Sequence, residues 1–339
     1  MKLYRNAILV CCALLPIAAG AQENVTIYGR IDLGLDWTAP NKGRNSGYAV
    51  RDNASRFGFK GSENLGHGLR ALFGVEYGFS ADASEPLSTR NSYVGMAGDF
   101  GAVALGRLDS ANPTKSPIYS LVTSNVSFVI HDAGAPAIGT KVLNARNRTS
   151  NSIGYMTPTF SGFTLMTRYY YNGSDIEVPK TGPIKNEGDI RQFDAGLDYR
   201  NGPLGLGVAY ASDRKTGGLL ANDFDEKVMG VGSYDFGLLR LSQLYGQDRY
   251  VETAKTRKNV DYWLVGAMLP MGSGKFMANY MERDVQKDRH GVLTKLQFGY
   301  GHQLSKRTML YALLDREDPN TNVHGNNIKT LSLGMQHNF

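Results

Sequence analysis

Residues 56–79 alternate between apolar and polar side chains at every second position, with a short turn at residues 63–68. This period of two indicates a β-hairpin, because successive side chains of a strand point to opposite faces. The apolar face consists of Phe57, Phe59, Leu69, Ala71, Phe73, Val75, Tyr77 and Phe79. The other face carries the charges of Arg56, Lys60, Arg70 and Glu76, which a soluble core could not bury without partners. The charged face therefore contacts water, either outside a soluble core or inside a lumen whose outer wall meets lipid.

The N-terminus distinguishes between these two environments. Lys2 and Arg5 precede an apolar run at residues 7–15, and small residues at 19–21 form a cleavage site. This pattern is typical of a secretory signal peptide over residues 1–21, and we expect a mature barrel domain at residues 22–339. The apolar run is too short for a transmembrane helix. Both cysteines lie within the predicted signal peptide, so the exported chain would have no disulfide.

Composition favours a membrane barrel over a helical membrane protein. The chain has 40 glycines and 19 tyrosines, and no apolar stretch after residue 21 reaches the roughly 18–20 residues of a spanning helix. In a β-barrel only every second residue has to be apolar. A membrane protein of this composition must therefore cross with strands.

The alternation continues to Phe339 and is divided by connections of two lengths, as in outer-membrane barrels. The seven short turns lie near residues 63–68, 98–101, 157–162, 201–203, 235–237, 270–274 and 305–307. The eight longer loops lie near residues 38–50, 80–88, 108–146, 172–190, 212–226, 247–258, 283–293 and 315–327. Fifteen connections predict an all-β fold, a 16-stranded antiparallel transmembrane β-barrel whose first and last strands close the ring.

The segment at residues 108–146 interrupts the alternation. It contains three prolines, and its length of about 39 residues is far above that of an ordinary connection. Apolar residues at positions 118–130 argue against disorder, and we find no helix or strand rhythm among them. Because these side chains need burial, we predict that the long loop folds into the lumen.

Small residues lie around the short turn at residues 98–101. By the expected alternation, Gly95, Ala97 and Gly101 would occupy the lipid-facing side. Small side chains at these positions favour close contact with another subunit, and a local irregularity explains them equally well.

Seven basic residues have the parity of the lumen face in their predicted strands, namely Arg30, Arg56, Lys60, Arg70, Arg90, Arg148 and Arg168. Grouped cations would raise the local potential and speed the access of anions. Alternatively, these cations form a solvated wall and pair with the acids on the same face, which are Asp32, Glu76, Asp194 and Asp198. The sequence leaves both interpretations open.

Several segments match those of a known family. They are VTIYGRIDLG from residue 25, SRFGFKGSENLGHGLRALFGVE from residue 55, RNSYVGMAGDFGAVALGR from residue 90, RNRTSNSIGYMTPTFSGF from residue 146, and the terminal GMQHNF. Through these segments the whole mature chain resembles the general porins of β-proteobacteria and Neisseria. The resemblance implies a homotrimeric barrel in the outer membrane, in contact with its lipid and lipopolysaccharide, with residues 108–146 as the inward-folded loop 3.

The same resemblance assigns roles to individual residues. It implies that Arg56, Arg90 and Arg148 are the basic residues of the pore constriction. Glu76 would face them across the opening, together with the loop 3 acids Asp109 and Asp132. Phe339 would be read by the outer-membrane assembly machinery. The chain departs from the family at Arg30, where an uncharged residue is more frequent.

Two functions are compatible with these features. One is a channel for passive diffusion of small hydrophilic solutes and inorganic ions, with moderate anion preference. The other is an outer-membrane barrel whose external loops act as a receptor or adhesin. Catalysis, a cofactor or a metal is not expected, because the six histidines are scattered and the chain has neither a metal-ligand spacing nor a GxSxG element. Nucleic acid is not an expected partner, because acidic residues nearly balance the basic ones.

Overall fold

The computed structural model describes residues 25–43, 45–108, 116–128, 148–172, 190–215, 217–284 and 291–339. The predicted signal peptide and the two loop 3 acids, Asp109 and Asp132, lie outside these ranges. Within these ranges the chain forms seventeen strand segments and one helix, α1 (Pro117–Asn125). No helix in the described part of the chain is long and apolar enough to cross a membrane.

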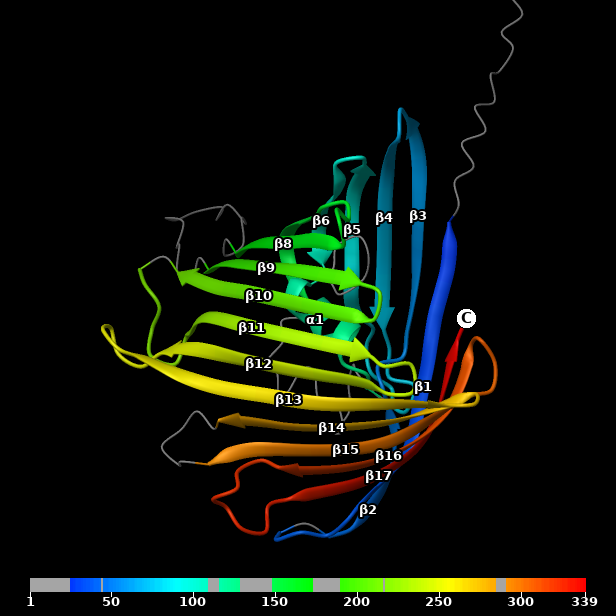
Figure 1. Ribbon diagram of the computed structural model, residues 1–339, viewed down its shortest axis with the longest axis vertical. Helices are drawn as coiled ribbons and strands as arrows, with labels where there is room; N and C mark the ends of the chain where they lie inside the picture. Colours follow the sequence, from blue (N-terminus) through cyan, green and yellow to red (C-terminus); the bar gives the residue numbers. More distant parts are fainter. Residues whose placement is uncertain are drawn as a thin grey trace, which may run out of the picture.

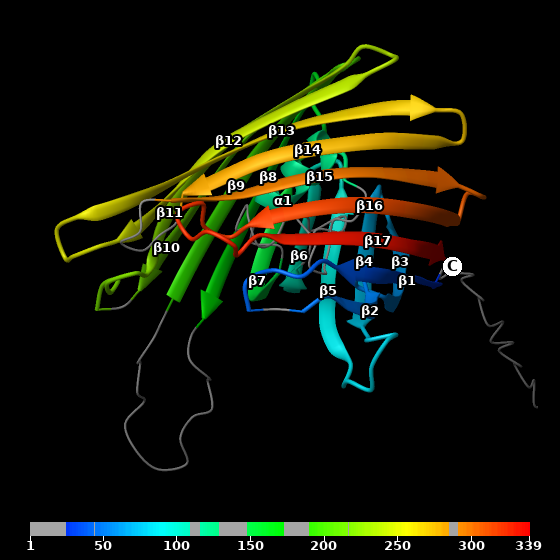
Figure 2. The ribbon, with the colours of Figure 1, turned by 90° about the horizontal axis from the view of Figure 1, so that it is seen from below.

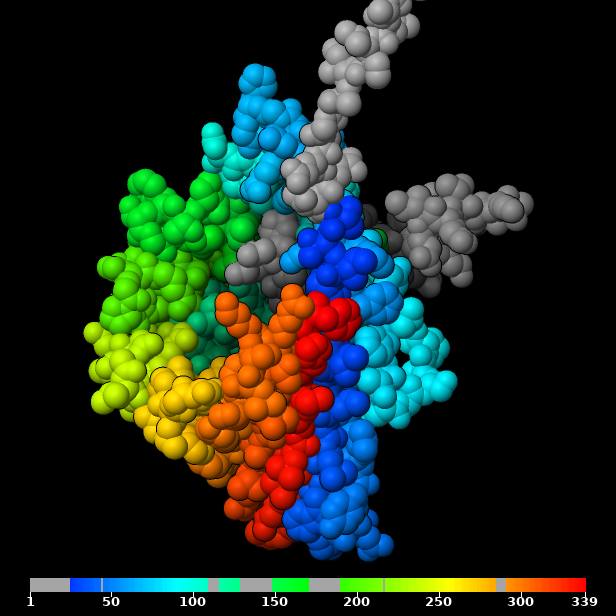
Figure 3. Space-filling view, turned by 90° about the vertical axis from the view of Figure 1, so that its right-hand side faces the viewer, coloured from blue at the N-terminus to red at the C-terminus, as the bar shows by residue number. Residues whose placement is uncertain are grey.

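The strands form one closed antiparallel barrel (Figures 1 and 2). They are β1 (Thr26–Thr38), β2 (Gly47–Asp52), β3 (Arg56–Gly66), β4 (Leu69–Gly78), β5 (Ser88–Gly98), β6 (Gly101–Leu108), β7 (Thr149–Met156), β8 (Phe163–Asn172), β9 (Ile190–Asn201), β10 (Leu204–Lys215), β11 (Phe224–Asp235), β12 (Arg240–Val251), β13 (Arg257–Met271), β14 (Gly274–Asp284), β15 (Val292–Gln303), β16 (Thr308–Asp318) and β17 (Ile328–Asn338). The ring closes where β1 pairs with β17, from Arg30 opposite Asn338 to Thr38 opposite Thr330. Figure 3 shows this seam, with the red end of the chain beside the blue start.

Two of the segments form a single wall strand, so the barrel has the predicted sixteen. Both β2 and β3 pair with β1, β2 along its second half and β3 along its first. They are separated at residues 53–55, where Ala54 has a φ of 64°. A positive φ is rare for alanine and interrupts regular pairing. The prediction of a loop up to residue 50 was wrong, because β2 extends the wall strand over part of that range.

A β-bulge lies on β5 at Arg90. Glu76 pairs with Asn91 and Tyr77 pairs with Thr89, so Arg90 is the extra residue between two regular pairs. A bulge of one residue moves every later side chain of that strand to the opposite face. No local sign of the bulge is present in the sequence, since neither a glycine nor a proline marks it.

The bulge overturns the expected position of the small residues. Gly95 and Ala97 face the lumen, in register with inward positions of β4. The outward positions are occupied by Val94 and Met96, which are 60% and 41% exposed. Of the three small residues, only Gly101 keeps an outward position. The predicted lipid-facing small surface is therefore absent at residues 95 and 97.

The described part of the long loop lies inside the barrel, as predicted (Figures 1 and 2). Contrary to the sequence analysis, it contains a helix. Ser116 caps α1, its side chain accepting a 3.5 Å hydrogen bond from the Tyr119 backbone N–H, and Pro117 occupies the first turn. The helix packs against the inner faces of β8–β11. Its fully buried Ile118, Leu121 and Val122 form a core with inward residues of the wall, including Met166, Met229, Val231, Leu244 and Leu264.

Candidate functional site in the barrel lumen

The part of the inner wall formed by β1 and β3–β5, away from the strands that hold α1, carries a group of charged side chains. Arg56 on β3, Glu76 on β4 and Arg90 on β5 lie side by side. The Glu76 carboxylate is 2.6 Å from Arg90 Nε and 3.8 Å from Arg56 Nε. The sequence resemblance placed Glu76 across the opening from the arginines. Instead it lies between them on the same wall, where it fixes the two guanidinium groups.

Beside this ion-pair group the wall is hollowed by a polar cavity of about 300 Å³. It is lined by Tyr28, Gly29, Arg30, Arg56, Lys60, Glu76, Asn91, Tyr93 and Asn338. The lining has three cations and one carboxylate. Arg30 Nε donates a 3.2 Å hydrogen bond to Asn338 Oδ1, and Lys60 Nζ lies 5.0 Å from the Tyr28 ring centroid. We call Arg30, Arg56, Lys60, Glu76 and Arg90 the basic wall.

The remaining predicted basic residues are not part of the basic wall. Arg70 is exposed near the short turn after β3 and lines a separate depression with Asp99. Arg148 is half-buried and lies directly before β7, where loop 3 returns to the wall. Of the three arginines assigned to the constriction, the structure brings Arg56 and Arg90 together through Glu76.

Arg168 on β8 was predicted to line the pore, but it is only 2% exposed. Its guanidinium forms a buried ion pair with Asp194 on β9, with Nη2 2.6 Å from Oδ2. It also donates to the Leu108 carbonyl at 3.4 Å and to Ser116 Oγ at 3.5 Å. Leu108 ends β6 and Ser116 caps α1, so Arg168 joins the two ends of the segment that leads into the loop helix.

Three further wall contacts hold the end of α1, and sequence reasoning missed them. Ser233 Oγ donates to Asn125 Oδ1 at 2.9 Å. An Arg240 Nη donates to the Ser124 carbonyl at 2.8 Å, and Asn279 Nδ2 donates to the Ser127 carbonyl at 3.0 Å. The available signal was their inward parity, which places polar side chains of β11, β12 and β14 where they can reach a segment inside the barrel.

Two buried charge groups also lie on inward positions of the wall. Lys227 pairs with Asp248, whose other oxygen is 2.6 Å from Arg283 Nη2. Between β15 and β16, Lys295 Nζ is 2.7 Å from the Glu317 carboxylate and 3.3 Å from that of Asp315. Buried charges are tolerated when they are paired in this way, and the pairs link neighbouring strands. Among the described residues, no three His, Cys, Asp or Glu side chains are arranged to hold a metal ion.

The C-terminal residue is built into the closing seam. Phe339 and Gly29 exchange two backbone hydrogen bonds of 3.0 Å. The phenyl ring covers Gly29, where an added Cβ would lie 2.2 Å from the ring. Gly29 therefore leaves the space that the terminal ring occupies.

A closed barrel with apolar side chains outside, charged side chains inside and a long loop folded into the lumen defines a membrane channel filled with water. The chain belongs to the Gram-negative porin family, whose sequence model matches residues 7–322. It is an outer-membrane porin, as the sequence resemblance predicted.

Individual relatives support this membership. Outer membrane porin protein 32 of Delftia acidovorans is 31% identical over 90% of this chain and 87% of its own length. An outer membrane porin protein of Bordetella pertussis is 27% identical over 87% of this chain and 89% of its own length. Among solved structures, the anion-selective porin from Comamonas acidovorans is 26% identical and superimposes with a TM-score of 0.76, covering 94% of this chain and all of that one.

Proposed function

We propose that this porin passes small anions in preference to cations and that the basic wall sets the preference. The observation that carries the proposal is the lining of the 300 Å³ cavity, with three cations to one carboxylate. A surplus of fixed positive charge on a narrow aqueous path concentrates anions and repels cations. The similarity to a solved porin that is itself described as anion-selective supports the same direction.

The geometry around Glu76 supports an anion preference of moderate size. Two unit charges about 4 Å apart interact by roughly 4 kcal/mol at an effective dielectric of about 20. Glu76 offsets part of the charge of Arg56 and Arg90 while holding both side chains in place. The net field is then strong enough to bias permeation and weak enough to release the ion.

We further propose that Arg148 completes the basic side of the constriction with Arg56 and Arg90. The loop 3 acids Asp109 and Asp132 would supply the acidic side, in place of Glu76. Arg30 and Lys60 would extend the basic path along the wall. The support is the resemblance of the sequence segments that carry the three arginines and the packing of α1 against the inner wall.

The reversal potential of the wild-type channel across a tenfold potassium chloride gradient tests the proposed preference. Potassium and chloride have similar mobilities, so the sign reports the charge of the path. We expect the sign of a chloride-selective pore. A potential of zero, or one of the opposite sign, would contradict the proposal.

Assembly of the porin adds three proposals. Residues 1–21 direct export and are removed, the mature chain forms a homotrimer, and the assembly machinery reads Phe339. The seating of the Phe339 ring on Gly29 supports a role of that residue beyond simple strand pairing. Phe339→Ala should lower the yield in the outer membrane, and an unheated gel should show a trimer. Parental yield in that variant, or a strictly monomeric particle by light scattering, would contradict the respective proposal.

A further inference from the structure

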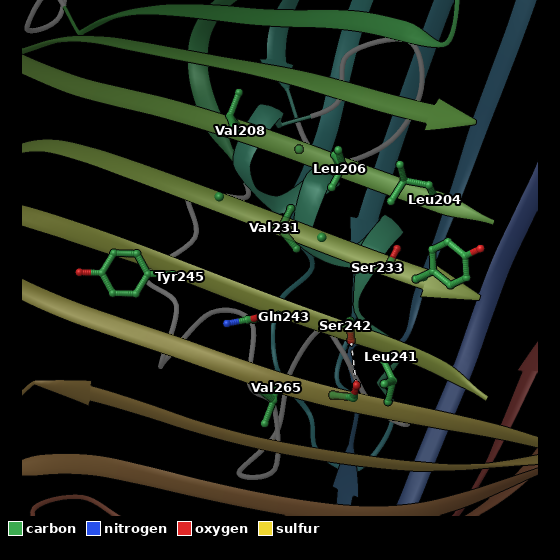
Figure 4. A pocket seen from close by; sticks show the side chains of 15 residues that line it. Leu204, Leu206, Val208, Val231, Ser233, Leu241, Ser242, Gln243, Tyr245 and Val265 are labelled. Atoms are coloured by element: carbon green, nitrogen blue, oxygen red, sulfur yellow. Dashed lines mark hydrogen bonds between the residues drawn. The ribbon is translucent and has the colours of Figure 1, made fainter. Parts of the chain in front are cut away.

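The outward face of the barrel has a groove over β11, with a volume of about 780 Å³. Figure 4 shows its two sides, with Leu206 and Val208 on β10 and Gln243 and Tyr245 on β12. Between them β11 presents two glycines at successive outward positions, Gly230 and Gly232. The groove is thus a missing row of side chains in an otherwise continuous apolar surface.

These two glycines differ from the glycines of the inner wall. Gly246 and Gly334 each leave room for a tyrosine ring, and an added Cβ would lie 2.3 Å and 2.2 Å from Tyr262 and Tyr311 respectively. At Gly230 an added Cβ would meet nothing within 4 Å.

At Gly232 an added Cβ would make only an ordinary 3.4 Å contact with Leu206. Neither Gly230 nor Gly232 has a positive φ. Glycine weakens a strand, and here neither packing nor backbone conformation requires it. The space is therefore available to something outside the chain.

The groove begins at the membrane boundary on the short-turn side, which is periplasmic in such barrels. Tyr234 lies at the end of the same outward row, with its ring 4.6 Å from that of Phe236 in the turn. Paired exposed aromatics at a strand end mark the interface where lipid head groups begin. Gly232 and its partner Gln243 lie one outward step further in, about 7 Å along the strand. Because the strands of such barrels are tilted by about 40°, these two residues lie about 5 Å deeper in the membrane than Tyr234. At that depth the lipid head groups give way to the ester-linked start of the acyl chains.

Gln243 brings a polar group to this depth. Its side chain is exposed on the outer face, and its amide makes no hydrogen bond within the described part of the chain. An amide facing hydrocarbon without a partner is costly, whereas an ester carbonyl beside it can accept a hydrogen bond.

The width of the groove selects the occupant. β10 and β12 are two strand spacings apart, about 9.6 Å, and their outward side chains narrow this distance from both sides. The remaining space accommodates one hydrocarbon chain. A second barrel would present a convex wall, which does not enter a groove one chain wide.

We propose that this groove binds one acyl chain of a diacyl glycerophospholipid of the periplasmic leaflet. The chain lies over Gly230 and Gly232, and the Gln243 amide donates a hydrogen bond to an ester carbonyl of that lipid. The site lies on the outside of the wall that holds α1, and it is independent of the ion preference proposed above.

Native mass spectrometry of the detergent-purified protein, delipidated and titrated with a defined phospholipid, tests the site. Gly230→Leu with Gly232→Leu fills the groove, and we expect at least tenfold weaker binding of one lipid per protomer. Val228→Leu enlarges a side chain on the same outward row outside the groove and should bind as the parent does. Equal binding by the filled and parent proteins would overturn the proposal.

A comparison of diester and diether lipids with the same head group and chains tests the amide separately. The wild type should prefer the diester about fivefold, the equivalent of one ordinary hydrogen bond. Gln243→Leu should remove this preference. This variant leaves both glycines in place, so it tests the site even if the variant with the filled groove does not fold. A wild type without the preference would overturn the role of Gln243. Dissociation of subunits on filling the groove, with lipid binding unchanged, would show that a second copy occupies it and would also overturn the proposal.

Discussion

The inward side chains on the two sides of the barrel lumen differ in what surrounds them. On β8–β14 a set of inward apolar side chains forms a core with α1, in which Leu121 and Leu264 are completely buried. Charged inward residues beside this core are held in buried ion pairs, such as that of Arg168 with Asp194. On β1 and β3–β5 the inward side chains are charged and surround a polar cavity. Both sides consist of the same antiparallel strand pairing. The difference shows that the inward residues beneath loop 3 are apolar or have their polar groups paired, whereas those beside the cavity keep a surplus of charge.

The largest expected effect on stability and conductance comes from a charge introduced into the apolar core between α1 and the wall. Leu121→Asp would bury a carboxylate that has no partner where the leucine fills the space above Gly207, and should cost more than about 5 kcal/mol, because loss of the leucine packing and burial of a charge add together. We expect α1 to leave the wall, its amides to exchange faster with solvent, and single-channel conductance to rise. Thr123→Asp, at a half-buried position of the same helix, is the control. Unchanged amide protection and conductance in the Leu121 variant would refute the apolar core as the support of the loop.

A smaller effect is expected at the root of the loop. Arg168→Met leaves Asp194 buried without its ion-pair partner and removes the contacts to Leu108 and Ser116, at a cost of about 3–5 kcal/mol. Open-channel current noise should increase, because the start of α1 is less firmly held. Adding Asp194→Leu should restore the heat stability of the barrel but should not lower the open-channel current noise to that of the parent. If the open-channel noise of the double variant equals that of the parent, Arg168 stabilises the barrel wall and does not hold the start of α1.

Glu76 allows the basic wall to be tuned in the opposite direction. Glu76→Gln removes the carboxylate between Arg56 and Arg90 without changing the size of the side chain. The net positive charge of the cavity lining rises by one, so the anion preference should increase modestly in a reversal-potential measurement. A decrease would mean that ordering of the arginines by Glu76 contributes more than its charge subtracts.

The smallest effect is that of salt, and it separates the two sides of the lumen. The Debye length falls from about 10 Å at 0.1 M to about 3 Å at 1 M, so the anion preference should weaken over this range. The packing of α1 is apolar, and its amide protection should stay constant in the same series. A preference that does not respond to salt would point to steric selection in place of fixed charge.

The sequence predicts most of the barrel because lipid and water impose a strict alternation on every strand. Short turns and long loops then give the strand count. The failures have local causes. The positive φ of Ala54 divides one strand, and the extra residue Arg90 inverts the parity of Gly95 and Ala97. Neither leaves a pattern in the surrounding residues.

The candidate site is less predictable than the barrel because parity does not reveal what lies over an inward residue. Arg56 and Arg90 were assigned from the family match, and the structure joins them through Glu76. Arg168 has the same parity, yet it is buried beneath the start of loop 3. The helix α1 was missed although Ser116 and Pro117 form a recognisable start. Its buried residues include six consecutive positions, residues 117–122, and they do not recur at the spacing of an amphipathic helix.

The central claim is that fixed positive charge on the basic side of the lumen sets ion preference. The most direct test is the reversal potential of a variant with Arg56, Arg90 and Arg148 all replaced by glutamine, in a salt gradient. We predict a shift toward cations with the barrel still folded, while Arg70→Gln, an exposed arginine outside the basic wall, leaves the potential unchanged. An unchanged potential in the triple variant would show that these arginines are paired wall residues without a role in selectivity.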